Sequence, residues 1–316
     1  MALTIAGAAD ALLRYPVTYA KDIAAAMRLD NEWMADNISS QRATDHTYVA
    51  PTAVLTDVIQ AYQCQFTPKG GVTLDQVANT LDQLKVDISI TCDDINKFYA
   101  SWLSDWYEIG KDPKVWSFAK YLWTKLILPK VNEELNWNYY WGVKAAPTPG
   151  VAGSSVASMT GLSKKLDDYV TAGKLVPITT GAITTSNVVD RVETFVAALP
   201  PAQKRRPGAI LVSQTIYEWY YKNYRLNFGT GNGVAGNDNI GAKIDGTNKW
   251  LQPMTSMEGS QKLIWAPDLI VGKRIGEADL PVPEVETSIR ELKLSMVFHR
   301  FIGIEYFFNT FVNDQA

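Results

Sequence analysis

Apolar and polar residues alternate over two stretches in the first third of the chain. Within residues 60–66, Tyr62, Cys64 and Phe66 fall on one face and Gln63 and Gln65 on the other, and residues 84–90 alternate strictly. Because successive side chains of a strand point to opposite faces, this period of two predicts two half-buried strands. The turn-forming sequence Pro68-Lys69-Gly70-Gly71 between them predicts a long two-stranded excursion from the body of the protein.

Residues 74–84 conflict with an uninterrupted hairpin. Their leucine and valine side chains recur three or four residues apart, at positions 74, 77, 81 and 84. This spacing places them on one face of a helix. The residues alone therefore leave the segment undecided between helix and strand.

Two helices are predicted next. The acidic pair at residues 93–94 can accept hydrogen bonds from the free N–H groups of a first turn, which predicts a helix that starts near residue 95 and is closed by Gly110. An Asp-Pro pair at residues 112–113 predicts a second, long helix to about residue 137. Since proline lacks the backbone N–H, Pro129 is expected to kink this helix or end it early.

The clearest boundary of the chain is a stretch rich in Pro, Gly and Ser at residues 145–163. Before the first strands, residues 1–50 are interpreted as an arm with little core of its own and one short helix at 20–28. After the boundary the patterns predict a mixed domain with helices at 162–172, 187–199 and 214–224, strands at 208–213, 262–266 and 268–271, the last ending in a turn at Gly272, and a loop at 228–246. Strict alternation at 292–298, continued past Gly303, predicts one or two long strands that finish the fold.

Composition narrows the function. The 316 residues are long enough for two domains, and 30 Lys+Arg against 33 Asp+Glu, a formal net charge of -3, remove the electrostatic reason to expect an autonomous nucleic-acid binder. Cys64 and Cys92 show neither metal-ligand nor redox spacing, so no cofactor, metal or disulfide framework is expected. The start of the chain lacks the basic residues of a signal peptide, and no run of 18 apolar residues occurs. We therefore expect a cytosolic product without a membrane span.

Candidate catalytic groups are weak. Residues 231–236 match GxGxxG, but a Tyr-rich helix precedes them and a polar loop follows, whereas a dinucleotide site needs a strand before and a helix after. His46 and His299 are expected at the surface, without a recognisable nucleophile. Adjacent carboxylates at 93–94 and 133–134 diverge by about 100° on a helix, which suits capping better than acid–base catalysis.

Tryptophan is the unusual feature. Six of the ten tryptophans fall in one region: Trp102, Trp106, Trp116, Trp123, Trp137 and Trp141. Such rings stack on sugars or nucleotides, and they also anchor cores and subunit interfaces. We favour core and subunit packing because no cluster of convergent polar groups accompanies the rings. A carbohydrate-binding or carbohydrate-cleaving protein stays open as an alternative.

The order of the elements resembles the tailed-bacteriophage major capsid protein, whose HK-ninety-seven-type fold encapsulins also use. Residues 65–71 and 85–87 look like its E-loop, and residues 249–254 and 263–267 look like its A-domain. The resemblance implies an α+β fold in five parts: an N-terminal arm (1–50), an E-loop hairpin (51–92), the spine-helix region of the P-domain (93–144), an A-domain with P-domain connections (145–288) and returning P-domain strands (289–316). It also implies that residues 74–84 are extended.

The resemblance further implies a structural, non-enzymatic subunit. Such chains assemble as hexamers and pentamers into the icosahedral shell that encloses the double-stranded DNA of a tailed phage. The implied partners are other copies, a separate scaffolding protein, a portal and weakly contacted DNA, in a virion whose subunits are synthesised in the host bacterial cytoplasm. The candidate assembly residues are Pro68, Lys69, Gly70, Gly71, Trp102, Trp106, Trp116 and Trp123. An encapsulin-like compartment that holds protein cargo is the other alternative.

Overall fold

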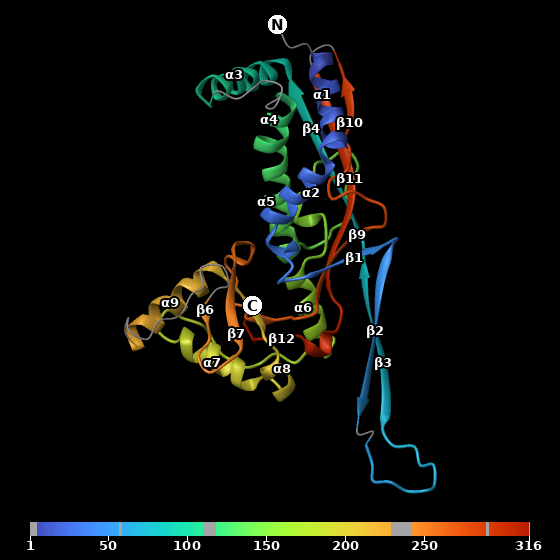
Figure 1. The fold of residues 1–316 in the computed structure, drawn as a ribbon, viewed down its shortest axis with the longest axis vertical. Helices are drawn as coiled ribbons and strands as arrows, with labels where there is room; N and C mark the ends of the chain where they lie inside the picture. Colours follow the sequence, from blue (N-terminus) through green and yellow to red (C-terminus); the bar gives the residue numbers. More distant parts are fainter. Residues whose placement is uncertain (1–4, 57–58, 110–117, 229–241, 289–290, 316) are drawn as a thin grey trace. The chain divides into compact units, whose positions relative to one another are not determined.

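The computed structural model describes residues 5–56, 59–109, 118–228, 242–288 and 291–315 (Figure 1). The chain forms two compact units, each built from three segments of sequence. Unit 1 consists of Met1–Ile38, Leu81–Lys164 and Val271–Phe301, and unit 2 consists of Ser39–Thr80, Lys165–Ile270 and Ile302–Ala316. Neither unit is therefore continuous in sequence.

The sheet of unit 1 is centred on the long strand β11 (Glu291–Ile304). β4 (Asp82–Thr91) pairs antiparallel with it from Glu291↔Thr91 to Arg300↔Asp82, and β10 (Glu284–Thr287) pairs along its opposite side. The strands predicted at residues 84–90 and 292–298 are both confirmed. β4, however, pairs with a strand about 200 residues away and not with residues 60–66. β9 (Leu269–Arg274) belongs to the same sheet and runs through Gly272, where a turn had been predicted. The glycine is needed there because the Phe301 ring occupies the place of a Cβ.

The helices of unit 1 account for most of its remaining chain. They are α1 (Ile5–Thr18), α2 (Ala20–Asp30), η1 (Glu32–Met34), α3 (Cys92–Ile109), α4 (Phe118–Leu122), η2 (Trp123–Ile127), α5 (Leu128–Trp141) and η3 (Ser155–Ala157), and α6 (Leu162–Thr171) begins there. α3 starts three residues earlier than predicted, at a capping box. The Thr91 hydroxyl donates to the Asp94 carboxylate at 2.7 Å and accepts from the Asp94 N–H at 3.3 Å. The hydrogen bond from the Thr91 hydroxyl lowers the pKa of the Asp94 carboxyl group.

The expectation that the N-terminal arm has little core is wrong for its first part. Leu12, Ile23 and Met27 of α1 and α2 are buried. The Trp33 indole, fully buried, stacks on Tyr140 of α5 at 6.1 Å and donates its Nε1–H to the Asn136 carbonyl. The apolar residues recur at helical spacing, so each helix presents one face to the unit.

Pro129 does not end the long helix, which continues to Trp141. Instead η2, immediately before it, is a turn of π-helix in which the Leu128 N–H bonds to the Trp123 carbonyl, five residues back. A proline ring clashes with the carbonyl four residues before it, and a π-turn moves the hydrogen-bond ladder out of that register. The start predicted at residues 112–113 lies outside the described residues.

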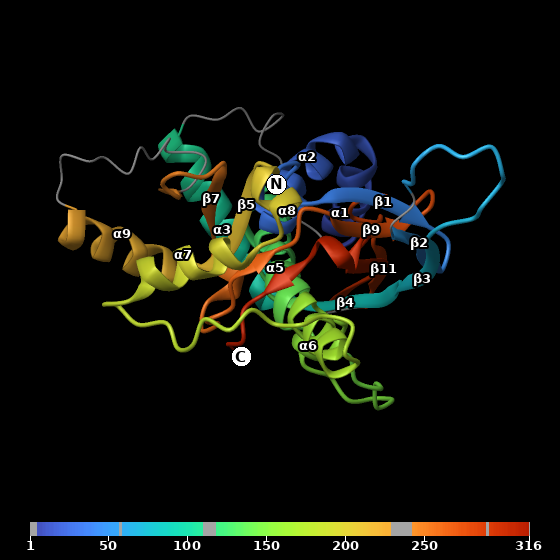
Figure 2. The same cartoon turned by 90° about the horizontal axis from the view of Figure 1, so that it is seen from below.

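The sheet of unit 2 has the order β12-β8-β5-β7-β6. Its strands are β5 (Gly208–Ser213), β6 (Ala242–Lys243), β7 (Lys249–Met254), β8 (Ile264–Trp265) and β12 (Phe311–Val312), with β5 and β7 parallel. α7 (Val188–Ala198) and α9 (Gln214–Phe228) pack on the face that carries Ile210 and Val212 (Figure 2). α8 (Pro201–Arg205), η4 (Thr255–Met257) and η5 (Phe307–Asn309) complete the unit. The helices and strand predicted at 162–172, 187–199, 208–213 and 214–224 are confirmed.

A separate two-stranded ribbon also belongs to unit 2. After the short strand β1 (Ser40–Thr44), β2 (Thr47–Thr56) and β3 (Gly71–Thr80) pair antiparallel from Thr47↔Thr80 to Thr56↔Gly71. Residues 71–80 and 82–91 are therefore extended, as the resemblance implied, because each has a partner strand. The strand predicted at residues 60–66 is wrong: described residues 59–70 are irregular and exposed, and form the loop that joins β2 to β3.

Candidate assembly site

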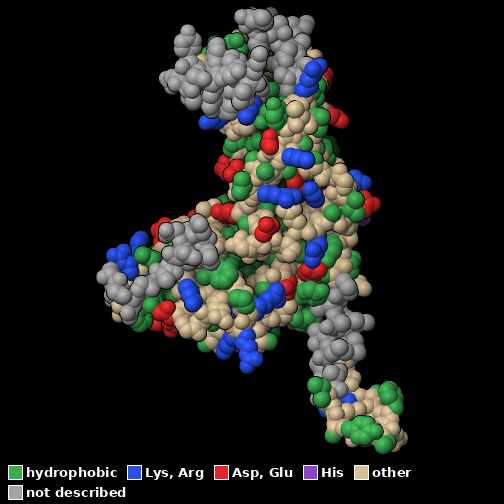
Figure 3. Space-filling model, in the orientation of Figure 1, with side chains coloured by type: hydrophobic (Ala, Val, Ile, Leu, Met, Phe, Trp, Pro, Cys, Tyr) green, Lys and Arg blue, Asp and Glu red, His purple; other side chains and the backbone are tan. Residues whose placement is uncertain are grey.

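The loop at the end of the β2–β3 ribbon, residues 59–70, is rich in exposed apolar side chains. Ile59, Tyr62 and Phe66 are 86%, 90% and 91% exposed, and apolar side chains are visible at the end of the ribbon (Figure 3). The loop is held together by two hydrogen bonds, from Gln60 Nε2 to the Thr67 carbonyl at 2.7 Å and from Lys69 Nζ to the Ile59 carbonyl at 3.0 Å. We call residues 59–70 the tip loop. Large apolar side chains left in water in this way are typical of surfaces that a partner covers.

The four residues predicted from the turn sequence lie where the tip loop re-enters the ribbon. Pro68, Lys69, Gly70 and Gly71 are all exposed, and Gly71 is the first residue of β3. Gly70 has φ +93°, a conformation that side chains with a Cβ rarely adopt, so a glycine is required at this turn.

The base of the ribbon is fixed by polar contacts within unit 2. Glu305 accepts hydrogen bonds from Arg42 Nη2 at 3.0 Å and from the Tyr48 hydroxyl at 2.7 Å. These bonds raise the pKa of both Arg42 and Tyr48. Asn79 Oδ1 accepts from Lys165 Nζ at 3.1 Å, and its amide packs against Gly303, where a Cβ would collide with it. The ribbon is therefore anchored at one end and uncovered at the other.

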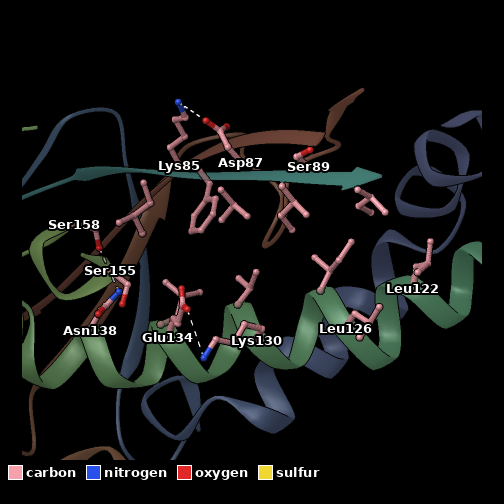
Figure 4. Close-up of a pocket in the computed structure, with 18 of the residues that line it drawn as sticks. Lys85, Asp87, Ser89, Leu122, Leu126, Lys130, Glu134, Asn138, Ser155 and Ser158 are labelled. Carbon is pink, nitrogen blue, oxygen red and sulfur yellow. Dashed lines mark hydrogen bonds and ion pairs between the residues drawn. The ribbon is translucent and has the colours of Figure 1, made fainter. Parts of the chain in front are cut away.

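A groove of about 520 Å³ lies in unit 1 between β4 and the helix η2–α5 (Figure 4). Apolar side chains form most of its lining: Leu84, Val86, Ile88, Ile90, Phe98, Leu122, Leu126, Ile127, Val131, Leu135 and Phe298. Leu84 and Ile90 are buried, whereas Val86 and Ile88 between them are half-exposed and Leu126 on the helix is 38% exposed. The middle of the groove is thus open to solvent.

Charged groups stand at the rim of this groove and pair with one another. The Lys85 ammonium pairs with the Asp87 carboxylate, whose pKa is lowered by that hydrogen bond. On the helix, Lys130 lies 3.2 Å from Glu133 and 3.6 Å from Glu134. At one end Asn138 Nδ2 donates to the Ser158 hydroxyl at 3.3 Å. The arrangement offers apolar surface and no set of groups poised for acid–base chemistry.

The tryptophans of the 102–141 region occupy two kinds of place. Trp102 is buried against Tyr99 and Phe118, and Trp123 is fully buried with its Nε1–H donating to the Leu12 carbonyl at 3.3 Å. The faces of these two indoles are covered by their own chain, which agrees with core packing and leaves them no room to stack on a sugar. The Trp106 side chain and all of Trp116 lie outside the described residues. Trp137 is 40% exposed beside Trp141.

The remaining candidates do not form a site. His46 is exposed, whereas His299 is half-buried with its Nδ1 3.3 Å from Glu277 Oε1. Within the described part of the chain no three His, Cys, Asp or Glu side chains are grouped so that they could hold a metal ion. The described helices include none long and apolar enough to cross a membrane. The GxGxxG sequence at 231–236 falls outside the described residues.

Sequence reasoning missed the groove and the anchor at Glu305. The alternation in residues 84–90 placed Val86 and Ile88 on an apolar face, but it contained no sign that α5 leaves them partly uncovered. The pairing of Glu305 with Arg42 joins residues 263 positions apart, which no local pattern indicates.

Solved structures with the same fold are assembled shells. The chain matches a protein of the satellite phage P4 procapsid at 12% identity and TM-score 0.54, over 93% of this chain and 98% of that one. It matches the capsid of a native GTA particle at 11% identity and TM-score 0.53, over 87% of both chains. It also matches the cyanophage A-1(L) capsid at 12% identity and TM-score 0.50, over 87% of this chain and 89% of that one.

The sequence itself gives no corresponding match. No family model matches the chain, and no curated protein matches it by sequence. The likeness therefore rests on the arrangement of helices and strands over nearly the whole chain. This chain has the α+β, HK-ninety-seven-type fold of tailed-phage major capsid proteins.

Proposed function

We propose that this protein is the structural major capsid subunit of a tailed phage, a non-enzymatic chain that self-assembles into an icosahedral shell around double-stranded DNA. The observation that carries the proposal is the coverage of the fold match, 93% of this chain and 98% of the P4 procapsid chain, which leaves little sequence for a separate activity. The exposed tip loop supports it, because a lone subunit gains nothing from two aromatic side chains in water.

The proposed organisation follows the fold family. Residues 1–50 are the N-terminal arm, 51–92 the E-loop, 93–144 the spine-helix region, 145–288 the A-domain with P-domain connections and 289–316 the returning strands. Hexamers and pentamers of the chain, assembled with a separate scaffolding protein and a portal, form the virion shell after synthesis in the host bacterial cytoplasm. With a net charge of -3, the subunit contacts packaged DNA weakly.

Negative-stain electron microscopy of the purified protein, expressed alone and with candidate scaffolding proteins, tests the proposal. Closed particles of uniform diameter are expected, and a chain that stays monomeric under every assembly condition and is absent from virions would contradict it. The contents decide between a capsid and an encapsulin-like compartment: nuclease-protected double-stranded DNA supports the first, and a protein cargo without DNA supports the second.

The predicted assembly residues of the tip loop give a second test. Deleting Pro68, Lys69, Gly70 and Gly71 is expected to leave a folded chain, since all four are exposed, and to impair shell formation. Thermal unfolding and particle yield measure the two effects separately. Normal particles from this deletion would count against a role of the tip loop in assembly.

A further inference from the structure

Basic side chains are concentrated at the C-terminal end of α8, in unit 2. Lys204, Arg205 and Arg206 follow one another there, and residues 194–217 around them contain no acidic residue. All three are exposed, and Lys and Arg side chains gather at the edge of unit 2 where α8 lies (Figure 3). The chain's net charge of -3 therefore hides a local excess of positive charge.

Two of these three cations have no carboxylate partner. The Arg206 guanidinium donates to Asp268 at 2.8 Å, and Asn309 Nδ2 occupies the same carboxylate at 2.7 Å. Among the described residues, Lys204 and Arg205 form no ion pair. Their charges are available to an anion from outside the subunit.

The basic surface continues onto η5. Gln203 Nε2 of α8 donates to Asn309 Oδ1 of η5 at 2.8 Å, so the two short helices are neighbours. The Lys174 ammonium, on an exposed residue, lies 5.8 Å from the centroid of the Phe307 ring in η5. With Asp268 included, the four cations of this surface give a net charge of +3. We call the surface formed by Lys174, Lys204, Arg205 and Arg206 the basic face.

The backbone that carries the basic face is held in place. Pro200 and Pro201 lie at the start of α8 and Pro207 directly after Arg206, and each proline fixes its own φ. The buried Lys249 ammonium donates to the Arg206 carbonyl at 3.1 Å. A preorganised set of cations loses less conformational entropy when it binds an anion.

The chemistry of the basic face favours the phosphate backbone of a duplex. Double-stranded DNA carries one negative charge per about 1.7 Å of its axis, whereas an extended acidic peptide carries at most one per about 3.3 Å. Guanidinium groups bind phosphate with two parallel hydrogen bonds, and lysine binds it as a point charge. With five residues, α8 is about 7.5 Å long, too short to lie along the major groove and read bases.

We propose that the basic face binds the phosphates of the double-stranded DNA inside the shell, as a small contact that is independent of DNA sequence. The inference rests on the proposed shell function and names the surface of the subunit that meets the packaged DNA. A contact of this size is weak in one copy, and its repetition over many copies makes it effective.

Fluorescence anisotropy of a labelled random-sequence duplex, titrated with dissociated subunits between about 50 and 200 mM KCl, tests the contact. Lys204→Ala combined with Arg205→Ala is expected to lower the affinity about tenfold at the lower salt concentration. It should also reduce the slope of log affinity against log salt by about 1.8, since each phosphate contact contributes about 0.9. Both residues are exposed, so the melting temperature should stay unchanged.

Two further variants serve as controls. Lys222→Ala combined with Arg225→Ala removes the same charge from exposed positions of α9, and is expected to change the affinity less than about twofold because salt screens distant charges. The exchange Lys204→Arg with Arg205→Lys keeps both cations and should bind as the wild type does. Arg206 is left in place because its guanidinium and carbonyl hold Asp268 and Lys249.

Several results would overturn the proposal. They are wild-type subunits that bind no duplex at about 50 mM KCl, an unchanged salt slope in the double variant, and an equal loss of affinity in the α9 control. Polyglutamate of the same charge that binds as tightly as the duplex would also overturn it, because the partner would then be an acidic protein. All of these leave the shell function in place, whereas failure of the wild-type chain to form particles would contradict the proposed function.

Lysine acetylation in wild-type particles measures the contact without a substitution. Lys204 is expected to react with acetic anhydride at least about threefold more slowly in DNA-filled particles than in particles formed without DNA, because bound phosphate protects it. Lys222 is the internal control and should react equally in both. Equal rates for Lys204 in filled and empty particles, measured by mass spectrometry of its peptide, would overturn the proposal.

Discussion

Aromatic side chains of unit 2 occupy two opposite environments. At the tip loop, Tyr62 and Phe66 are about nine-tenths exposed. In the β5–β7–β8 core, Trp265 is fully buried: Lys249 Nζ lies 3.0 Å from its ring centroid and its Nε1–H donates to Gln203 Oε1 at 3.2 Å. The core aromatic stabilises the subunit it belongs to, whereas the tip aromatics contribute almost no buried surface to it.

Trp265 and Lys249 lie at one end of a connected set of polar contacts. Lys249 donates to the Arg206 carbonyl at 3.1 Å, and the Arg206 guanidinium donates to Asp268 at 2.8 Å. Asn309 Nδ2 donates to Asp268 at 2.7 Å, and Asn309 Oδ1 accepts from Gln203 at 2.8 Å. Gln203 Oε1 in turn accepts from the Trp265 indole. Lys249 and Trp265 are buried members of this set, so the loss of a partner costs most at these two positions. Substitutions in the two regions should therefore have separable effects.

The largest effect on assembly is expected at the tip. If the proposed role of the tip loop is correct, the double substitution Tyr62→Ser and Phe66→Ser is expected to lower particle yield at least about tenfold, a change equivalent to about 1.4 kcal/mol in assembly free energy, because it removes exposed apolar surface. The melting temperature of the dissociated subunit should stay unchanged, since both side chains are exposed. Val176→Ser, 78% exposed in unit 2 but outside the ribbon, is the matched control. A lower melting temperature with normal particle yield would reverse the roles assigned to the two regions.

Trp265→Ala is expected to have the largest effect on folding. Removing a fully buried indole should lower the free energy of unfolding, measured by urea denaturation, by about 3–5 kcal/mol. It should also remove the ring that lies against the Lys249 ammonium. Trp265→Phe keeps a ring beneath the ammonium but loses the hydrogen bond to Gln203. The lost bond should lower the free energy of unfolding by about 1 kcal/mol, and the smaller buried ring should lower it further. Equal losses in both variants would mean that the ring itself contributes little.

Lys249 makes the core sensitive to alkaline pH. Burial lowers its pKa to about 8, from 10.5 for an exposed lysine. Between these values the unfolded chain binds more protons than the folded one, so the free energy of unfolding should rise with pH, by up to about 3 kcal/mol in total. Below pH 8 the protonated amine is present in both states and this contribution is flat. Urea denaturation from pH 7 to 10.5 should therefore show the rise in the wild type relative to Lys249→Met, and parallel curves would contradict it.

The smallest effect is expected at the base of the ribbon. Glu305→Gln keeps the shape of the side chain but weakens its bonds to Arg42 and Tyr48, and should lower the free energy of unfolding by about 1–2 kcal/mol. Lys130→Ala, which removes an exposed ion pair, should change it by less than about 0.5 kcal/mol. An effect of Glu305→Gln no larger than that of Lys130→Ala would show that the base is not held by these contacts.

Local patterns predicted the elements whose partners lie close by or whose burial is complete. β5, with apolar residues throughout, has the predicted bounds, and α6, α7 and α9 agree within a few residues because their apolar stripes pack on one face. The same reasoning failed at residues 60–66. Alternation records that one side of a segment is suited to apolar surroundings, but it does not say which chain supplies them.

Pairing over long distances also escaped the local patterns. Residues 84–90 were correctly predicted as a strand but assigned to the wrong partner, since the true partner, β11, lies about 200 residues away. The helical spacing at residues 74–84 did not decide the structure: residues 71–80 pair with β2, and residues 82–91 pair with β11.

The sequence by itself determined the helices at residues 162–172, 187–199 and 214–224 and the strands at 84–90 and 208–213, because their periodic apolar patterns depend on neighbouring residues. Only the tertiary structure decided that β4 pairs with β11, that Trp102 and Trp123 are buried, and that the tip loop is exposed. Those features depend on contacts between residues far apart in the chain, and the free energy of such contacts is determined by packing geometry that no local pattern contains.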